Sequence, residues 1–198
     1  MLKSKYSWIS VKIGIIFSRI PLSPNAWTAL SLLVAILGFL SLFQKDFLAA
    51  FFLFSASAAM DAIDGAVARV VGRVTALGAY LDGIVDRLVE LLLLLGLMFA
   101  GIPDFVLPSA VWLALLIFFS VFVSYARAYA DHRGAVSKSQ IDSMGGLLER
   151  AERMILMLAG LLLYQIAPIY LTYAIIAAVF LSAITALQRI WFVVSHSN

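Results

Sequence analysis

The sequence predicts an all-α integral membrane protein with six transmembrane helices, preceded by an amphipathic helix at the membrane surface. Of its 198 residues, 64% are hydrophobic and only 13% are charged, and the mean hydropathy is +1.04. Soluble domains are far more polar than this, so the lipid bilayer is the expected solvent. A membrane-spanning helix needs about 20 apolar residues, and six stretches of the chain are long enough.

Residues 1–20 interleave basic and large apolar side chains instead of separating them. A cleavable signal peptide would have a short charged start followed by an uninterrupted apolar run. The apolar residues recur here at helical spacing, which predicts an amphipathic juxtamembrane helix lying on the membrane. A plain cytosolic extension is the alternative. The basic residues are Lys3, Lys5, Lys12 and Arg19, and the apolar ones are Trp8, Ile9, Ile13, Ile16 and Phe17.

The six predicted spans are separated by short polar or turn-forming segments. Nothing in the sequence repeats, and no linker divides it, which predicts a single domain over residues 1–198 with a six-helix core over 25–193. The chain has no Cys, which excludes disulfides, cysteine metal sites and thiol catalysis. The spans are expected at residues 25–43, 47–69, 76–100, 107–130, 148–165 and 168–193.

Basic residues are distributed unevenly along this pattern of spans. If the amino terminus is cytosolic and the spans alternate, every Lys and Arg except Lys45 falls at or toward the cytosolic side. The charged ends of the second to fifth spans then meet on that side. We therefore expect a multi-pass protein of the cell membrane whose amino terminus and active site face the cytoplasm. No nucleic-acid partner is expected.

Four aspartates interrupt the second and third predicted spans: Asp61, Asp64, Asp82 and Asp86. A charge inside a membrane span costs several kcal/mol unless something nearby compensates it. Each pair projects from one helical face, and a short connection around Gly72 makes the two helices antiparallel neighbours. Four hard oxygen ligands suit Mg²⁺ or Mn²⁺, and two such ions would balance four carboxylates.

Small residues accompany the aspartates. Gly65 and Ala68 lie beside the first pair, and Gly78 lies one turn before Asp82 on the same face. They would let a ligand or the facing helix approach closely, although ordinary helix packing explains such positions equally well.

Basic residues stand at the membrane edge of the same helices. Arg69 and Arg73 are suited to bind a pyrophosphate. An alternative interpretation pairs Asp82 or Asp86 with Arg69 or Arg87 as buried ion pairs. Four carboxylates outnumber the local cations, however, so ion pairing would leave negative charge that a metal site removes.

The segment that begins at Asp61 resembles the signature of the CDP-alcohol phosphotransferase family. The matching positions, at the family's spacing, are Asp61, Asp64, Gly65, Ala68, Arg69, Gly78, Asp82 and Asp86. The family architecture, six helices after a surface helix, also covers most of the chain. The resemblance implies an enzyme that transfers a phosphatidyl or archaetidyl group from a CDP-linked lipid to an alcohol and releases CMP. It also implies a homodimer.

The resemblance further implies a role for individual residues. Asp61, Asp64 and Asp82 would bind metal, and Asp86 would be a metal ligand and the catalytic base that takes the proton of the acceptor hydroxyl. The resemblance also implies that Asn25 and Thr28 bind CDP, although the sequence Ser23-Pro24-Asn25 is also a common way for a helix to begin. The implied CDP-binding residues are Asn25, Thr28, Asp61, Gly65, Ala68, Arg69, Thr75 and Gly78.

The later helices resemble the branch that contains phosphatidylinositol-phosphate and archaetidylinositol-phosphate synthases. Residues 124–127 and 146–153 correspond to segments that hold an acceptor phosphate in that branch, which implies Arg127, Arg150 and Arg153 as the phosphate-binding set. Inositol phosphate is therefore the expected acceptor. Glycerol phosphate, serine, or soluble CDP-inositol with inositol phosphate remain alternatives, because Tyr129 replaces a basic residue found in bacterial relatives.

Other interpretations of the charged residues remain open. The three arginines could instead set the topology and pair with Glu149, Glu152 or Asp131. Intramembrane carboxylates also occur in ion-coupled transporters, although the chain has neither an inverted repeat nor a pair of broken helices. A membrane prenyltransferase would carry its two aspartate motifs on well-separated helices, whereas both pairs here lie in one helical hairpin.

Overall fold

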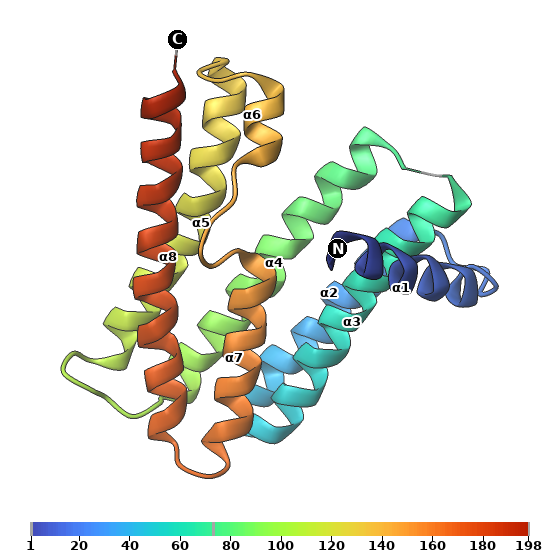
Figure 1. Ribbon diagram of the computed structural model, residues 1–198. Coiled ribbons are helices and arrows are strands. Elements are labelled where there is room, and N and C mark those ends of the chain that lie inside the picture. The colour runs from blue at the N-terminus through green and yellow to red at the C-terminus, as the bar shows by residue number, and fades with distance from the viewer. Residues whose placement is uncertain (1, 73, 198) are drawn as a thin grey trace. The chain divides into compact units, whose positions relative to one another are not determined.

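The computed structural model describes residues 2–72 and 74–197, and this part of the chain forms eight α-helices (Figure 1). Its described residues contain no β-strand, only an isolated bridge between Phe105 and Leu107. The prediction of an all-α protein is therefore confirmed. The chain divides into two units, Met1–Gly96 and Leu97–Asn198, which are described separately below.

The first unit contains three helices and most of a fourth: α1 (Leu2–Phe17), α2 (Pro24–Phe43), α3 (Phe47–Val71) and α4 (Ala76–Ala100). Local signals set the helix ends. Ser23 caps α2 by accepting a hydrogen bond from the Ala26 N–H at 3.2 Å, and Asp46 caps α3 by accepting one from the Ala49 N–H at 2.9 Å. Gly72 ends α3 with a left-handed φ of 68°, a conformation that glycine adopts without strain.

Close packing joins α2 to α3, which lie side by side in Figure 1. Phe54 is fully buried, and its ring leaves no room for a side chain at Gly38 on α2. The Ser57 hydroxyl donates to the Ser31 carbonyl oxygen at 2.8 Å, which satisfies a buried polar group across the same interface. The two helices therefore form a rigid pair on which the residues near the end of α3 are mounted.

Helix α1 packs against α3 and meets α2 through an edge-to-face contact between Phe17 and Trp27, with ring centroids 5.7 Å apart. On its open side, the Lys12 ammonium lies 3.7 Å from the centroid of the exposed Trp8 ring. The location of α1 on the membrane surface stays a prediction. Three residues named for this helix lie outside the described side chains: Lys3, Lys5 and Ile9. Arg73, which was named for the connection after α3, lies outside the described residues.

The second unit contains α5 (Ser109–Arg133), α6 (Lys138–Ser143), α7 (Arg150–Tyr164) and α8 (Ile169–His196). Helix α8 is its centre, because it packs against both α5 and α7 (Figure 1). At its amino-terminal end, the Thr172 hydroxyl donates to the Pro103 carbonyl oxygen at 2.7 Å and so fixes the loop before α5. A small core holds α6 near the other end, and it consists of Ala130, Val136, Ile141 and Met144 with Phe192 and Val193 packed against it.

Helices α2, α3, α5 and α8 are long and apolar enough to cross a membrane. The chain is therefore a multi-pass membrane protein. Helices α4 and α7 also coincide with predicted spans, but α7 has 15 residues, a length of about 22 Å. Helix α4 carries four charged side chains between Asp82 and Glu90. The count of six spans stays a prediction.

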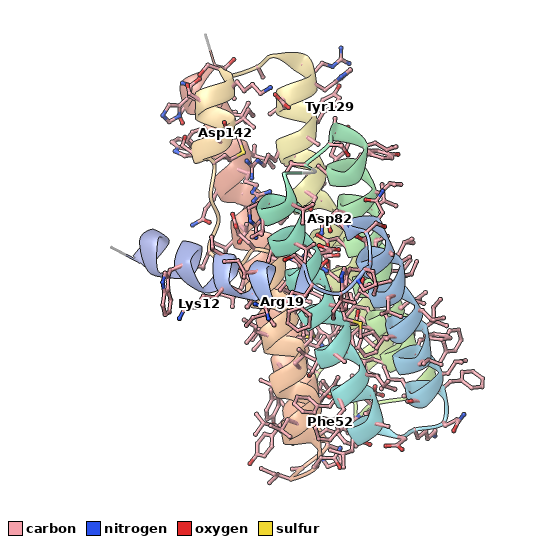
Figure 2. All side chains as sticks on the ribbon, turned by 90° about the vertical axis from the view of Figure 1, so that its right-hand side faces the viewer. Lys12, Arg19, Phe52, Asp82, Tyr129 and Asp142 are labelled. Atoms are coloured by element: carbon pink, nitrogen blue, oxygen red, sulfur yellow. The ribbon has the colours of Figure 1, made fainter. Side chains whose placement is uncertain are left out.

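Phe54 and Phe52 provide a test of the α2–α3 packing, because they lie on the same helix with 0% and 62% of their surface exposed. We expect Phe54→Ala to lower the free energy of unfolding by about 3 kcal/mol, because it leaves a cavity against Gly38. Phe52→Ala, at the position labelled in Figure 2, should change it little. Unfolding of the detergent-solubilised protein measures both, and equal losses would contradict this packing.

Candidate active site

Three aspartates converge where α3 faces α4. Asp61 and Asp64 on α3 and Asp82 on α4 each offer one carboxylate oxygen, and these oxygens all lie within 4.8 Å of one another. Asp64 is buried, with 4% of its surface exposed, while the other two are partly buried. Figure 2 marks Asp82 on its helix. Asp86, one turn further along α4, does not belong to this group of three.

A threonine on α2 holds one of these carboxylates. The Thr28 hydroxyl lies 2.6 Å from Asp64 Oδ2 and donates to it, and the Pro24 carbonyl oxygen is a second acceptor at 3.2 Å. A charge-assisted hydrogen bond of this length fixes the orientation of the carboxylate. The sequence places Thr28 near the start of a helix but gives no sign of this contact, which joins residues 36 positions apart.

A cavity of about 290 Å³ lies beside the aspartates, between the start of α2, the end of α3 and the start of α4. All the expected CDP-binding residues line it except Asp61. The sequence interpretation missed three lining residues, Pro24, Val74 and Ala79, each of which is adjacent to a predicted one. The complete lining is Pro24, Asn25, Thr28, Asp64, Gly65, Ala68, Arg69, Val74, Thr75, Gly78, Ala79 and Asp82.

Polar groups on two sides of this cavity are fixed by local structure. Thr75 immediately precedes α4, and its hydroxyl oxygen accepts a hydrogen bond from the Gly78 N–H at 3.0 Å. The absence of a side chain at Gly78 leaves that wall open toward the Asn25 carboxamide oxygen. On α3, the Arg69 guanidinium folds back beside Gly65. A cationic donor and an amide therefore line the same cavity as the carboxylates, an arrangement that can bind an anion and a metal ion side by side.

The donor set at the aspartates fits a hard divalent cation. Its ligands are all carboxylate oxygens, which Mg²⁺ and Mn²⁺ prefer, and they come from two helices, α3 and α4. Among the described residues, no other set of three acidic, histidine or cysteine ligands is so close together. A cation would also remove the repulsion between three carboxylates placed a few ångströms apart.

The three arginines expected to bind the acceptor lie in the second unit, on α5 and the first turn of α7. Arg153 is 2% exposed and Arg150 is partly buried. Arg127 lies 3.9 Å from Asp142 on α6, a carboxylate that the sequence interpretation did not name as its partner. The Arg127 side chain is 38% exposed and that of Asp142 is 73% exposed, so this solvent-accessible ion pair is worth at most about 1 kcal/mol.

A fourth arginine, Arg189 on α8, is buried near the same turn of α7. It donates to the Val123 carbonyl oxygen at 2.7 Å and pairs with Glu149 at 3.3 Å. From the sequence, Arg189 was expected only to fall at or toward the cytosolic side. A signal was present, because Arg189 lies two turns inside the end of an otherwise apolar helix, where a charge needs a partner.

Comparison with known proteins decides the family. The sequence model for CDP-alcohol phosphatidyltransferase matches residues 21–194. The chain belongs to this family. It is therefore a membrane-embedded CDP-alcohol phosphotransferase, an enzyme of phospholipid synthesis. The transporter and prenyltransferase interpretations are set aside.

Two named proteins are similar over nearly the whole chain. Archaetidylinositol phosphate synthase from Aeropyrum pernix is 31% identical over 186 residues, which is 93% of this chain and 90% of that protein. Phosphatidylinositol phosphate synthase from Mycobacterium tuberculosis, solved with manganese and citrate, is 26% identical with a TM-score of 0.78, covering 94% of this chain and 89% of that one. The structure of the same synthase with CDP-DAG bound is 27% identical to this chain, with a TM-score of 0.77, and the match covers 93% of each chain.

Thr28 offers a test of the carboxylate geometry that is separate from turnover. We expect Thr28→Val to weaken divalent-metal binding about tenfold, because residues that orient metal ligands typically contribute that much. Thr28→Ser keeps the hydroxyl and should retain most of the affinity. Binding of Mn²⁺ to the purified protein, followed by electron paramagnetic resonance, measures both. Equal affinities for the valine variant and the unchanged protein would contradict an orienting role for Thr28.

Proposed function

We propose that this enzyme transfers a phosphatidyl or archaetidyl group from a CDP-linked lipid to inositol phosphate and releases CMP. The observation that carries the proposal is the convergence of Asp61, Asp64 and Asp82 beside a cavity lined by the residues expected to bind CDP. A CDP-linked substrate requires carboxylates that bind a metal and a cationic donor that binds its diphosphate, both in one cavity.

Each side of the cavity has a part in binding the donor. Arg69 pairs with the diphosphate, and the open wall at Gly65 and Gly78 lets that group approach the backbone closely. Asn25 and Thr75 hydrogen-bond to the nucleotide, while Ala68 leaves room for it. Thr28 keeps one oxygen of Asp64 directed toward the site through the 2.6 Å hydrogen bond.

The metal site is formed by Asp61, Asp64 and Asp82, with Asp86 completing it for a second ion. A bound Mg²⁺ or Mn²⁺ would supply stabilisation of the negative charge that develops on the diphosphate and on the leaving CMP. The manganese in the complex of the mycobacterial synthase supports this choice of ion.

Asp86 is the proposed base. Its carboxylate takes the proton of the acceptor hydroxyl, whose oxygen forms a bond to the phosphorus that carries the lipid. The bond from that phosphorus to the bridging oxygen breaks, and CMP leaves with the electron pair. Asp86 suits the role because it lies one turn beyond Asp82, outside the group of three carboxylates.

Inositol phosphate is the proposed acceptor for two reasons. The similar proteins from Aeropyrum pernix and Mycobacterium tuberculosis are named for phosphoinositol products. In addition, Arg127, Arg150 and Arg153 lie in the two sequence segments, 124–127 and 146–153, that the resemblance assigns to an acceptor phosphate. We further propose a homodimeric, single-domain enzyme of the cell membrane with its amino terminus and active site toward the cytoplasm, because only Lys45 breaks the positive-inside pattern.

An assay of CMP release tests the proposed function. Purified protein with a CDP-linked lipid and Mg²⁺ or Mn²⁺ should release CMP when inositol phosphate is added, and chelation of the metal should stop the release. Glycerol phosphate, serine and inositol should give little product. CMP release with one of these instead of inositol phosphate would overturn the proposed acceptor assignment. No CMP release with any acceptor would overturn the proposed activity.

Asp86→Asn tests the proposed base. It removes a proton acceptor and keeps the shape, so turnover should fall by about 100-fold or more while Mn²⁺ binding largely persists. Asp104→Asn is a matched control. Asp104 lies in the loop before α5, where its Oδ1 accepts a hydrogen bond from the Ser109 N–H at 2.7 Å. This substitution should leave turnover unchanged. Full activity of the Asp86 variant would exclude Asp86 as the base.

A further inference from the structure

The segment 144–149, which connects α6 to α7, has no regular secondary structure yet is fixed to α8 along its length. The Leu148 N–H donates to the Thr185 hydroxyl oxygen at 2.9 Å, and the Leu147 N–H donates to Gln188 Oε1 at 3.0 Å. These hydrogen bonds connect residues 37 and 41 positions apart. Two successive backbone donors are thus held by side chains one turn apart on a single helix.

The Thr185 hydroxyl uses both its donor and its acceptor capacity. Thr185 is fully buried, and its own proton is donated to the Leu181 carbonyl oxygen at 2.8 Å. Its oxygen can therefore act only as an acceptor toward Leu148. Loss of this hydroxyl would leave the Leu148 N–H facing an apolar side chain away from water, which costs more than the bond itself contributes.

Steric fit and charge fix the same segment at two further points. The Thr185 methyl group occupies the space that a side chain at position 146 would need, so only glycine fits there. At the end of the segment, Glu149 pairs with Arg189 at 3.3 Å. Contacts from three positions of α8, namely 185, 188 and 189, therefore determine where α7 begins.

The first turn of α7 follows at once. The Glu149 N–H donates to the Glu152 carboxylate at 3.0 Å, and the Arg153 N–H closes the turn on the Glu149 carbonyl oxygen, also at 3.0 Å. The positions of Arg150 and Arg153 therefore depend on how residues 146–149 are held. A displacement of this segment would move both guanidinium groups together.

We propose that Thr185 and Gln188 are positioning residues for acceptor binding: they hold residues 147 and 148 so that Arg150 and Arg153 present their guanidinium groups to the acceptor phosphate. This inference rests on the proposed role of those two arginines. Neither Thr185 nor Gln188 touches the substrate. Their effect is on the acceptor, since binding of the CDP-linked donor depends on residues of the first unit.

The test compares two threonines of α8. Thr185→Val should raise the KM for inositol phosphate about tenfold and leave the KM for the CDP-linked lipid unchanged, because a misplaced binding group weakens only the ligand it contacts. Thr185→Ser keeps the acceptor oxygen and should restore the KM. Thr172→Val is the matched control, because it removes an equally buried hydroxyl that holds the loop at Pro103. It should leave both KM values unchanged.

Gln188→Leu adds a graded comparison. Gln188 is exposed, so water can replace its hydrogen bond to Leu147, and the expected rise in the acceptor KM is about two- to threefold. Hydrogen exchange of the peptide that contains residues 144–149 supplies a readout independent of any substrate. Exchange at Leu148 should accelerate in Thr185→Val and stay unchanged in Thr172→Val.

The outcomes separate this inference from the proposed function. A rise in the acceptor KM with Arg150→Gln but not with Thr185→Val would overturn the positioning role and leave the acceptor assignment intact. Equal KM rises for the donor and the acceptor, or for Thr185→Val and Thr172→Val, would reduce Thr185 to a general structural residue. Unchanged exchange at Leu148 in Thr185→Val would show that the hydroxyl does not hold the segment. An unchanged KM with Arg150→Gln would remove the arginine assignment and the positioning role together.

Discussion

Three carboxylates lie within 4.8 Å of one another where α3 faces α4, and their mutual repulsion is the constraint on which the first unit depends. Two unit charges 4 Å apart repel by about 4 kcal/mol at the effective dielectric constant of a protein surface. The helices that carry these charges must therefore be held by other contacts. Phe54 against Gly38 and the Ser57–Ser31 hydrogen bond provide this support for α3, which carries two of the three aspartates, by holding it to α2.

The positions of the helices could be predicted because apolar runs and helix caps are local signals. Ser23 and Asp46 cap the helices that follow them, and glycine at position 72 ends α3 as its conformational freedom suggests. The span count could not be settled in the same way. Helix α4 places charged residues inside a run of the right length, and α7 is short, so hydropathy does not decide whether either crosses the bilayer.

The candidate site was predictable where it follows helical spacing. A separation of three residues puts Asp61 and Asp64 on one face, and the resemblance supplied most of the residues that line the cavity. Contacts made by packing were not predictable, because they depend on how two separate helices face each other and not on the spacing within one helix. The hydrogen bond from Thr28 to Asp64 and the pairing of Arg127 with Asp142 are of this kind.

The fit of Gly146 against Thr185 also constrains how this sequence can change. A side chain at position 146 and the methyl group at position 185 would occupy the same volume, so a larger residue at the first position requires a smaller one at the second. Serine at position 185 would relieve the overlap and keep the hydroxyl, whereas alanine would relieve it and release the Leu148 N–H. The order of substitutions therefore matters: Thr185 must be replaced by a smaller residue before Gly146 can be replaced by a larger one.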